Sequence, residues 1–174
     1  MFAWGSNACG APRREIPMDA AEAVPGQGVS TVLKRDGTVW VWGCNWQGQF
    51  GNGTRTDPPG VNNGWELVPQ KVAGVAGVTA IAVGSGRQTL ALLKDGTLRG
   101  WGNTDWGQIG AGVSADFQER PVTVRLAGVR AVFAAGNNSF AVKTDGTFWA
   151  WGAGGRGEWP FRVDTKIPMM VPLP

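Results

Sequence analysis

Three aspartates, Asp36, Asp95 and Asp145, are the ionisable side chains that recur most regularly along the chain. They stand in near copies of one nine-residue stretch, RDGTVWVWG at 35–43, KDGTLRGWG at 94–102 and TDGTFWAWG at 144–152. Two carboxylates that face one substrate can act as general acid and base. Here each aspartate precedes a glycine between two strand-like runs, which is the pattern of a hairpin turn. We therefore predict that these carboxylates hold turns and catalyse no reaction.

Histidine is absent from the sequence. Its absence excludes Ser-His-Asp and Cys-His catalytic groups and every metal site that contains histidine. The run GAGGRG at 152–157 has the spacing of a dinucleotide-binding loop, but EWP follows it where a helix would have to begin. We expect a protein that is not an enzyme, with no catalytic residue, no metal and no cofactor.

The composition predicts a soluble chain of one domain. It has 174 residues and a net charge of +3, with 16 basic and 13 acidic residues, and because the two signs are interspersed a nucleic-acid partner is disfavoured. The sequence contains neither the pattern of a signal peptide nor a membrane-spanning run. We expect a cytoplasmic or otherwise unassigned location and no membrane partner. Cys9 and Cys44 lack the spacing of a zinc or redox motif; two free buried thiols are expected, with a disulfide as the alternative.

A longer repeat surrounds the nine residues. The Trp-Gly pairs end at Gly5, Gly43, Gly102 and Gly152, in steps of 38, 59 and 50 residues, which suits a four-stranded propeller blade or a solenoid unit. β-like runs lie on both sides of each Asp-Gly turn, a further apolar run precedes each hairpin, and another follows a proline. No segment has a convincing helical stripe. The sequence therefore predicts an all-β fold with sheets covered on both faces, as stacked blades are.

The residues that follow the Trp-Gly pair resemble the regulator of chromosome condensation repeat family, whose pattern continues with Asn and then Gly-Gln-hydrophobic-Gly. The matching positions are Trp42, Gly43, Asn45, Gly48, Gln49, Phe50 and Gly51 in one copy and Trp101, Gly102, Gly107, Gln108, Ile109 and Gly110 in the next. Only Trp151, Gly152 and Gly157 remain in the last copy. The resemblance implies a β-propeller, usually of seven blades. The repeated positions expected to hold the fold are Asp36, Gly37, Trp42, Gly43, Asp95, Gly96, Trp101, Gly102, Asp145, Gly146, Trp151 and Gly152.

The expected strands amount to about 3.5 four-stranded blades, half of a seven-bladed ring. The repeat units are expected at 1–12 (partial), 13–66, 67–118, 119–166 and 167–174, with the last as the start of the next blade. An open ring needs an explanation, because bare blade faces drive association. Three explanations are possible. The chain is a fragment, or it forms a homodimer that completes the ring, or a different polypeptide covers it.

Four tryptophans fall outside the repeated strand positions, and we expect them in loops after the hairpins. Tryptophan supplies large contact area and is enriched at binding hot spots. Together with three polar neighbours they form the predicted partner-binding rim: Trp46, Gln47, Trp65, Asp105, Trp106, Arg156 and Trp159. The alternative is that these tryptophans pack beneath their own loops. The long loop at 52–66 is a further expected partner contact.

We therefore predict a non-enzymatic protein–protein interaction module that binds a protein partner through its rim loops. The family resemblance implies two alternatives. In the namesake proteins it implies guanine-nucleotide exchange on a small GTPase, and in bacterial relatives it implies inhibition of a secreted enzyme such as a β-lactamase. The family often has histidine just before the inner strand, where this chain has Val29, Gln88 and Asn138, so the chain departs there from the exchange-factor pattern.

Overall fold

Antiparallel β-strands form all of the regular secondary structure in the described part of the chain, where no helix occurs. The structure is a computed structural model that describes residues 2–3, 14–15, 19–56, 65–113, 115–154 and 164–172. Three four-stranded sheets follow one another along the chain, and a two-stranded sheet pairs β1 (Phe2–Ala3) with β2 (Arg14–Glu15). The all-β fold class is confirmed.

Each four-stranded sheet pairs its strands in chain order. Blade 1 contains β3 (Ala20–Pro25), β4 (Val29–Lys34), β5 (Val39–Cys44) and β6 (Trp65–Lys71). Blade 2 contains β7 (Val78–Val83), β8 (Gln88–Leu93), β9 (Leu98–Asn103) and β10 (Phe117–Thr123). Blade 3 contains β11 (Val129–Ala135), β12 (Asn138–Lys143), β13 (Phe148–Gly152) and β14 (Thr165–Val171).

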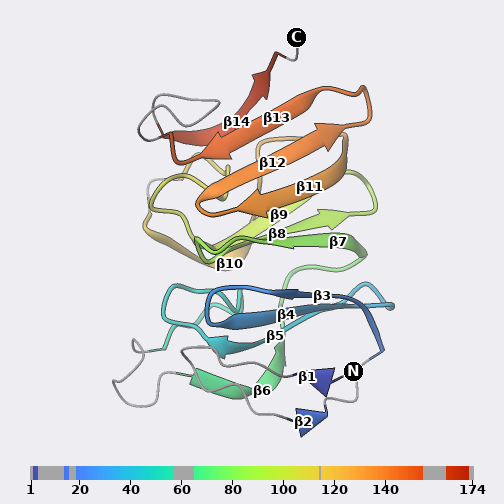
Figure 1. The fold of residues 1–174 in the computed structure, drawn as a ribbon, viewed down its shortest axis with the longest axis vertical. Coiled ribbons are helices and arrows are strands. Elements are labelled where there is room, and N and C mark those ends of the chain that lie inside the picture. Colours follow the sequence, from blue (N-terminus) through green and yellow to red (C-terminus); the bar gives the residue numbers. More distant parts are fainter. Residues whose placement is uncertain are drawn as a thin grey trace.

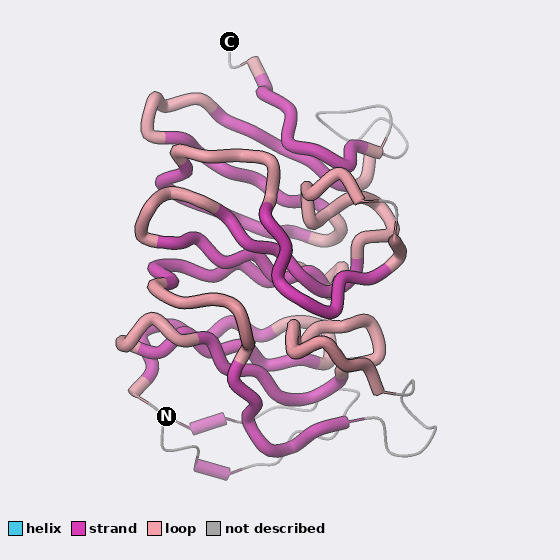
Figure 2. The backbone as a smooth tube through the Cα atoms, turned by 180° about the vertical axis from the view of Figure 1, so that it is seen from behind, coloured by secondary structure: helices cyan, strands magenta, loops and turns pink. Residues whose placement is uncertain are grey.

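The blades stack face to face, as in a β-propeller (Figure 1). The first strands β3, β7 and β11 are neighbours across the blades, so they form the inner side, and β6, β10 and β14 are the outer strands. Seen from behind, the strands run across the stack and the connections lie at their two ends (Figure 2). The connections at these ends therefore lie outside the stacked sheet faces, and parts of them contact the next blade.

The proline-containing strand ends each blade, which corrects the predicted repeat units. β6 continues the antiparallel ladder from β5, with Trp40 opposite Lys71, and β14 continues it from β13 in the same way. The boundaries expected after residues 66, 118 and 166 thus fall inside β6, β10 and β14. Residues 167–171 complete blade 3 and do not begin a further blade.

The Asp-Gly stretches form the turns between the second and third strands. The Asp36 carboxylate accepts hydrogen bonds from the Thr38 main-chain N at 2.9 Å and from Thr38 Oγ1 at 2.6 Å. Asp95 and Asp145 make the same pair of bonds to the threonine two residues on. In Asp36 these bonds, helped by Lys34, hold the pKa at about 2, below its usual 3.8. Each carboxylate thus serves its own turn.

The glycine of each Trp-Gly pair meets another backbone segment at close range. At Gly102, φ is +97° and a Cβ would lie 2.2 Å from the carbonyl oxygen of Arg87. The same oxygen accepts a hydrogen bond from Asn103 N at 3.1 Å. Gly43 and Gly152 stand in the same relation to the turns of their own blades. Only glycine lets the third strand close onto the turn that precedes the second strand.

The tryptophan of each pair joins its blade to the previous one. Trp101 is fully buried, and its Nε1 donates to the main-chain oxygen of Gln49 in blade 1 at 2.9 Å. Trp151 donates in the same way to Gln108 in blade 2 at 2.9 Å. A Cβ on Gly51 would lie only 2.9 Å from the Trp101 ring. The Gly-Gln-hydrophobic-Gly stretch is therefore the receptor for the tryptophan of the following blade.

The apolar core lies between the blades. One buried cluster joins blades 1 and 2 and includes Leu33, Val39 and Ile81. A second cluster joins blades 2 and 3 and includes Leu90 and Ala141. Burial of these side chains is the main favourable contribution to folding. It requires stacked blades, because a single sheet would leave one of its apolar faces in water.

Cys44, the last residue of β5, is disulfide-bonded, which corrects the expectation of two free thiols. The sequence spacing could not indicate this bond, because disulfide pairing depends on distance in space. Cys9, the other cysteine of the sequence, lies outside the described residues. Among the described residues, no helix has the length and apolar character of a membrane span.

Candidate functional site

One end of the strands carries the turns before each second strand and the loops after each third strand. We call this end the loop face and define it by the turns at 26–28, 84–87 and 136–137 and the loops at 45–56 and 104–113. Its parts are tied together, because Cys44 N donates to Gly28 O at 2.7 Å and Asn103 N donates to Arg87 O. The Asp-Gly turns lie at the opposite end.

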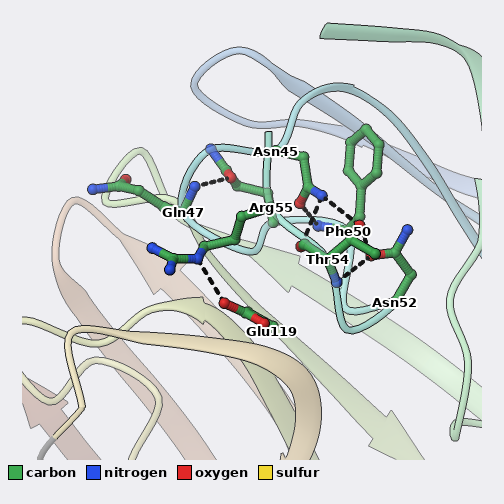
Figure 3. A network of polar contacts seen from close by, with 8 residues as sticks. Asn45, Gln47, Phe50, Asn52, Thr54, Arg55 and Glu119 are labelled. Atoms are coloured by element: carbon green, nitrogen blue, oxygen red, sulfur yellow. Dashed lines mark hydrogen bonds and ion pairs between the residues drawn. The ribbon is translucent and has the colours of Figure 1, made fainter. Parts of the chain in front are cut away.

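The loop at 45–56 is held by side chains that bond its own backbone (Figure 3). Asn45 accepts from Phe50 N at 2.9 Å and donates to the Thr54 carbonyl oxygen at 2.9 Å. Arg55 forms an ion pair of 2.6 Å with Glu119 of β10, which fastens the loop of blade 1 to blade 2. A loop held this way presents its side chains in a fixed arrangement, which lowers the entropy cost of binding.

Trp46, the residue after Asn45, contacts the next blade through Arg87. The Arg87 guanidinium carbon lies 4.5 Å from the centroid of the Trp46 ring, within the range of a cation–π interaction. Both side chains are half-buried. Trp46 therefore neither packs wholly beneath its own loop nor projects freely, and it forms a composite surface with the β7–β8 turn.

Arg87 stands in the left-handed backbone region, with φ of +66°, and among the described residues no other non-glycine residue has a positive φ. The equivalent turn residue of blade 1, identified by its hydrogen bond to the third strand, is Gly28 with φ of +76°. Burial lowers the pKa of the Arg87 guanidinium, and the charge of Asp105 opposes this change. An arginine in a strained backbone position is a candidate functional residue.

Asp105 and Trp106 lie in the loop after β9, and the charge of Asp105 interacts with Arg87. The Asp105 main-chain N donates to Asn103 Oδ1 at 2.8 Å, and Trp106 N donates to Gln108 Oε1 at 2.9 Å. These bonds fix the backbone and leave the two side chains outward, with 45% of Trp106 exposed. Trp106 is the large exposed aromatic surface of this loop.

The other predicted rim residues have different positions. Gln47 is only 6% exposed, so its side chain is not part of the exposed surface of the loop, and its contact with a partner stays a prediction. Trp65 does not lie in a loop: it begins β6, opposite Cys44, because the antiparallel ladder starts there. Arg156 and Trp159, and the part of the long loop at 57–64, lie outside the described residues.

Arg87 was absent from the predicted rim. One feature of the sequence could have indicated it. The turn before the second strand ends with Gly28 in blade 1, whereas the equivalent position in blade 2, directly after Gly86, is an arginine. Among the described residues no group of three or more metal-ligating side chains occurs. Trp46, Arg87, Asp105 and Trp106, which we call the Arg87 cluster, combine aromatic area with one charge of each sign. Such a surface is suited to binding a protein.

Comparison with known proteins gives one family. The model of the regulator of chromosome condensation (RCC1) repeat matches residues 36–93. The RCC1 domain-containing protein RUG3, mitochondrial, of Arabidopsis thaliana is 33% identical over 123 residues, which are 69% of this chain and 26% of that protein. Human E3 ubiquitin-protein ligase HERC2 is 31% identical over 74% of this chain and 3% of its own length. Mouse RCC1-like G exchanging factor-like protein is 27% identical over 99% of this chain and 41% of its own.

Solved structures share the fold. Human WBSCR16 superposes with a TM-score of 0.73 at 25% identity, over 91% of this chain and 39% of that one. Yeast RCC1 (Prp20), solved bound to Kap60, superposes with a TM-score of 0.70 at 23% identity, over 89% of this chain and 37% of that one. The chain thus spans less than half of each of these proteins.

Proposed function

Because this chain belongs to the regulator of chromosome condensation repeat family, we propose that it is a non-enzymatic propeller module that binds a protein partner on its loop face. One protein of this fold, yeast RCC1 (Prp20), was solved with the protein Kap60 bound to it. The repeated residues of this chain hold turns and join blades, so the loop residues outside the repeat, such as Trp106, have no such structural role. Loops on a rigid scaffold commonly carry binding residues.

The Arg87 cluster is the observation that supports this proposal. Trp106 is 45% exposed on a loop that its own hydrogen bonds hold in place. A pre-ordered aromatic side chain loses little entropy on binding, which is why tryptophan and arginine are enriched among hot-spot residues. Loss of such a residue typically weakens a complex by about 2 kcal/mol or more.

The test replaces Ser85, an exposed residue of the 84–87 turn on the loop face, with a photo-crosslinking amino acid and identifies proteins that attach to it in extracts of the source cells. Trp106→Ala should then weaken binding of the identified partner by at least about tenfold while leaving the thermal unfolding curve nearly unchanged. Val68→Ala is the matched control, because Val68 is 55% exposed but lies in the middle of β6, the outer strand of blade 1, away from the loop face. Equal losses in both variants would contradict a loop-face site.

Guanine-nucleotide exchange is the second candidate, and the similarity to the mouse G exchanging factor-like protein favours it. Such a protein accelerates nucleotide release by binding the GTPase, without covalent chemistry of its own. The test measures release of fluorescent GDP from a panel of small GTPases with and without the chain. Unchanged release rates across the panel would exclude exchange activity on those GTPases.

Blade 3 has an apolar outer sheet surface, which we call the end face and define by Phe133, Phe140 and Phe148. The rings of Phe140 and Phe148 stack with centroids 5.9 Å apart. Strand pairing puts Phe133 and Phe140 where blade 2 has Ala82 and Leu90. Blade 3 packs on those two side chains, so that Ala82 is only 6% exposed and Leu90 is 0% exposed, whereas Phe133 remains 54% exposed. The end face is thus the same surface that a following blade covers elsewhere in this chain.

We further propose that a second copy of the chain covers the end face and helps to complete the ring. Light scattering at several concentrations should give twice the monomer mass of 18.4 kDa, and Phe133→Asp should return the mass to that of the monomer. Val68→Asp is the control, because Val68 is equally exposed at 55% but lies on β6 of blade 1. A monomeric wild type at all concentrations would refute the dimer and leave the loop-face proposal intact.

A further inference from the structure

We propose that Arg87 binds a carboxylate of the partner protein, while the adjacent Trp106 receives an apolar side chain next to that carboxylate. The inference rests on the proposed loop-face function and names the chemistry of the partner. The occupant is an acidic protein segment in which an aspartate or glutamate stands beside an aliphatic or aromatic residue.

The geometry of Arg87 leaves its donors available. Its guanidinium carbon lies over the Trp46 ring, 4.5 Å from the ring centroid. Within the described residues no hydrogen bond or ion pair joins the Arg87 side chain to another group. A guanidinium whose donors are unused can bind a carboxylate through two parallel hydrogen bonds.

The surroundings favour a carboxylate over a phosphate. Asp105 interacts with the charge of Arg87, and the carboxylate of Glu119 lies beside the neighbouring loop, paired with Arg55. A phosphate group carries nearly two negative charges at neutral pH, so its attraction to Arg87 and its repulsion by these acidic groups are both about twice those of a carboxylate. The choice between the two ligands therefore depends on the apolar surface beside Arg87. The exposed ring of Trp106 adds apolar area, which a protein segment can cover and an isolated anion cannot.

The backbone at Arg87 supports a role in binding. A non-glycine residue in the left-handed region is less stable than glycine there, and the equivalent residue Gly28 avoids this cost. In the free chain the Arg87 side chain contacts Trp46 and interacts with the charge of Asp105, and it makes no hydrogen bond. A contact that forms only in the complex would account for an arginine in this strained backbone position.

The experiment selects peptides from a phage-displayed library of random 12-residue peptides against the whole chain. We expect the selected peptides to contain Asp or Glu beside an apolar residue. Binding of one such peptide, measured by fluorescence polarisation, should weaken at least about tenfold on Glu→Gln replacement in the peptide. It should weaken similarly in Arg87→Gly, and less in Arg87→Lys, which keeps the charge and loses the planar fork.

Arg87→Gly is the decisive variant, because it installs the residue that the blade 1 turn already has. Its melting temperature should equal or exceed that of the wild type, so a loss of binding would not come from unfolding. Peptides that depend on Trp106 but bind Arg87→Gly unchanged would overturn the carboxylate contact and leave the proposed function standing. Tighter binding of a phosphoserine version of the peptide would overturn it in favour of phosphate. A selection that yields no peptide dependent on either residue would overturn both proposals.

Discussion

Replacing Gly102 with alanine should destabilise the chain by about 3–6 kcal/mol, because several costs act at one place. The new Cβ would lie 2.2 Å from the Arg87 carbonyl oxygen, and that oxygen cannot move away without losing its hydrogen bond to Asn103 N. The left-handed φ of +97° adds a penalty of about 1–2 kcal/mol for a residue with a Cβ. Relief of the overlap by backbone shifts costs a further 1–3 kcal/mol or so, and the weakened hydrogen bond costs about 1 kcal/mol.

Gly74→Ala supplies the matched control. Gly74 has φ of +76°, and a Cβ there would meet nothing within 4 Å, so this variant carries the penalty for φ without the overlap. The assay is urea unfolding followed by tryptophan fluorescence, with the free energy extrapolated to water. We expect Gly74→Ala to lose about 1 kcal/mol, and Gly102→Ala to melt about 10 °C below the wild type. If the two variants unfold within 1 kcal/mol or so of each other, the close backbone contact does not explain the glycine.

Three further outcomes are expected. The wild type should lose stability as the pH falls from about 4 towards 2, because the pKa of Asp36 and Asp145 is about 2 in the folded chain and 3.8 when unfolded. The double variant Asp36→Asn/Asp145→Asn should lose less stability over this range. Acid titrations followed by circular dichroism measure the difference. A thiol-reactive dye should find no free thiol in the unreduced, denatured chain, since Cys44 is disulfide-bonded; one or two reactive thiols would contradict this. Trp151→Phe should lower the free energy of unfolding in urea by at least about 1 kcal/mol more than Trp149→Phe does, because of these two residues only Trp151 donates to a buried carbonyl oxygen of the neighbouring blade. Equal losses in the two variants would show that this hydrogen bond does not stabilise the chain.

The sequence was sufficient for the repeated parts of the fold. Asp-Gly turns, the Trp-Gly strand and the loop motif depend on neighbours within about ten residues, so their residue types predict their geometry. The grouping of strands into blades was harder to predict from the sequence. Whether the strand of Ile167 pairs with the strand before it or begins a new sheet depends on a ladder between distant residues, and the residue pattern of a strand is the same in both cases.

The candidate site was predicted only in part, for a related reason. Trp106 was identified because exposed aromatic residues outside the repeat are visible in the sequence. Arg87 was missed because its importance comes from a contact with Trp46, 41 positions earlier and in another blade. Gln47 is one residue from Trp46 and was assigned with it, yet its side chain turns inward. Proximity in sequence therefore does not establish which side of a loop a residue occupies.

The bond from the tryptophan of one blade to the loop of the previous blade runs in a single direction along the chain. Trp151 needs blade 2, and Trp101 needs blade 1, whereas neither bond requires the blade that comes after. Removing blade 3 would thus expose the Gln108 loop but leave the tryptophan of blade 2 in its receptor. The stability of such an array is approximately a sum of interactions between adjacent blades. Because each blade bonds to the blade before it, each can dock onto a folded neighbour in the order in which the blades are synthesised.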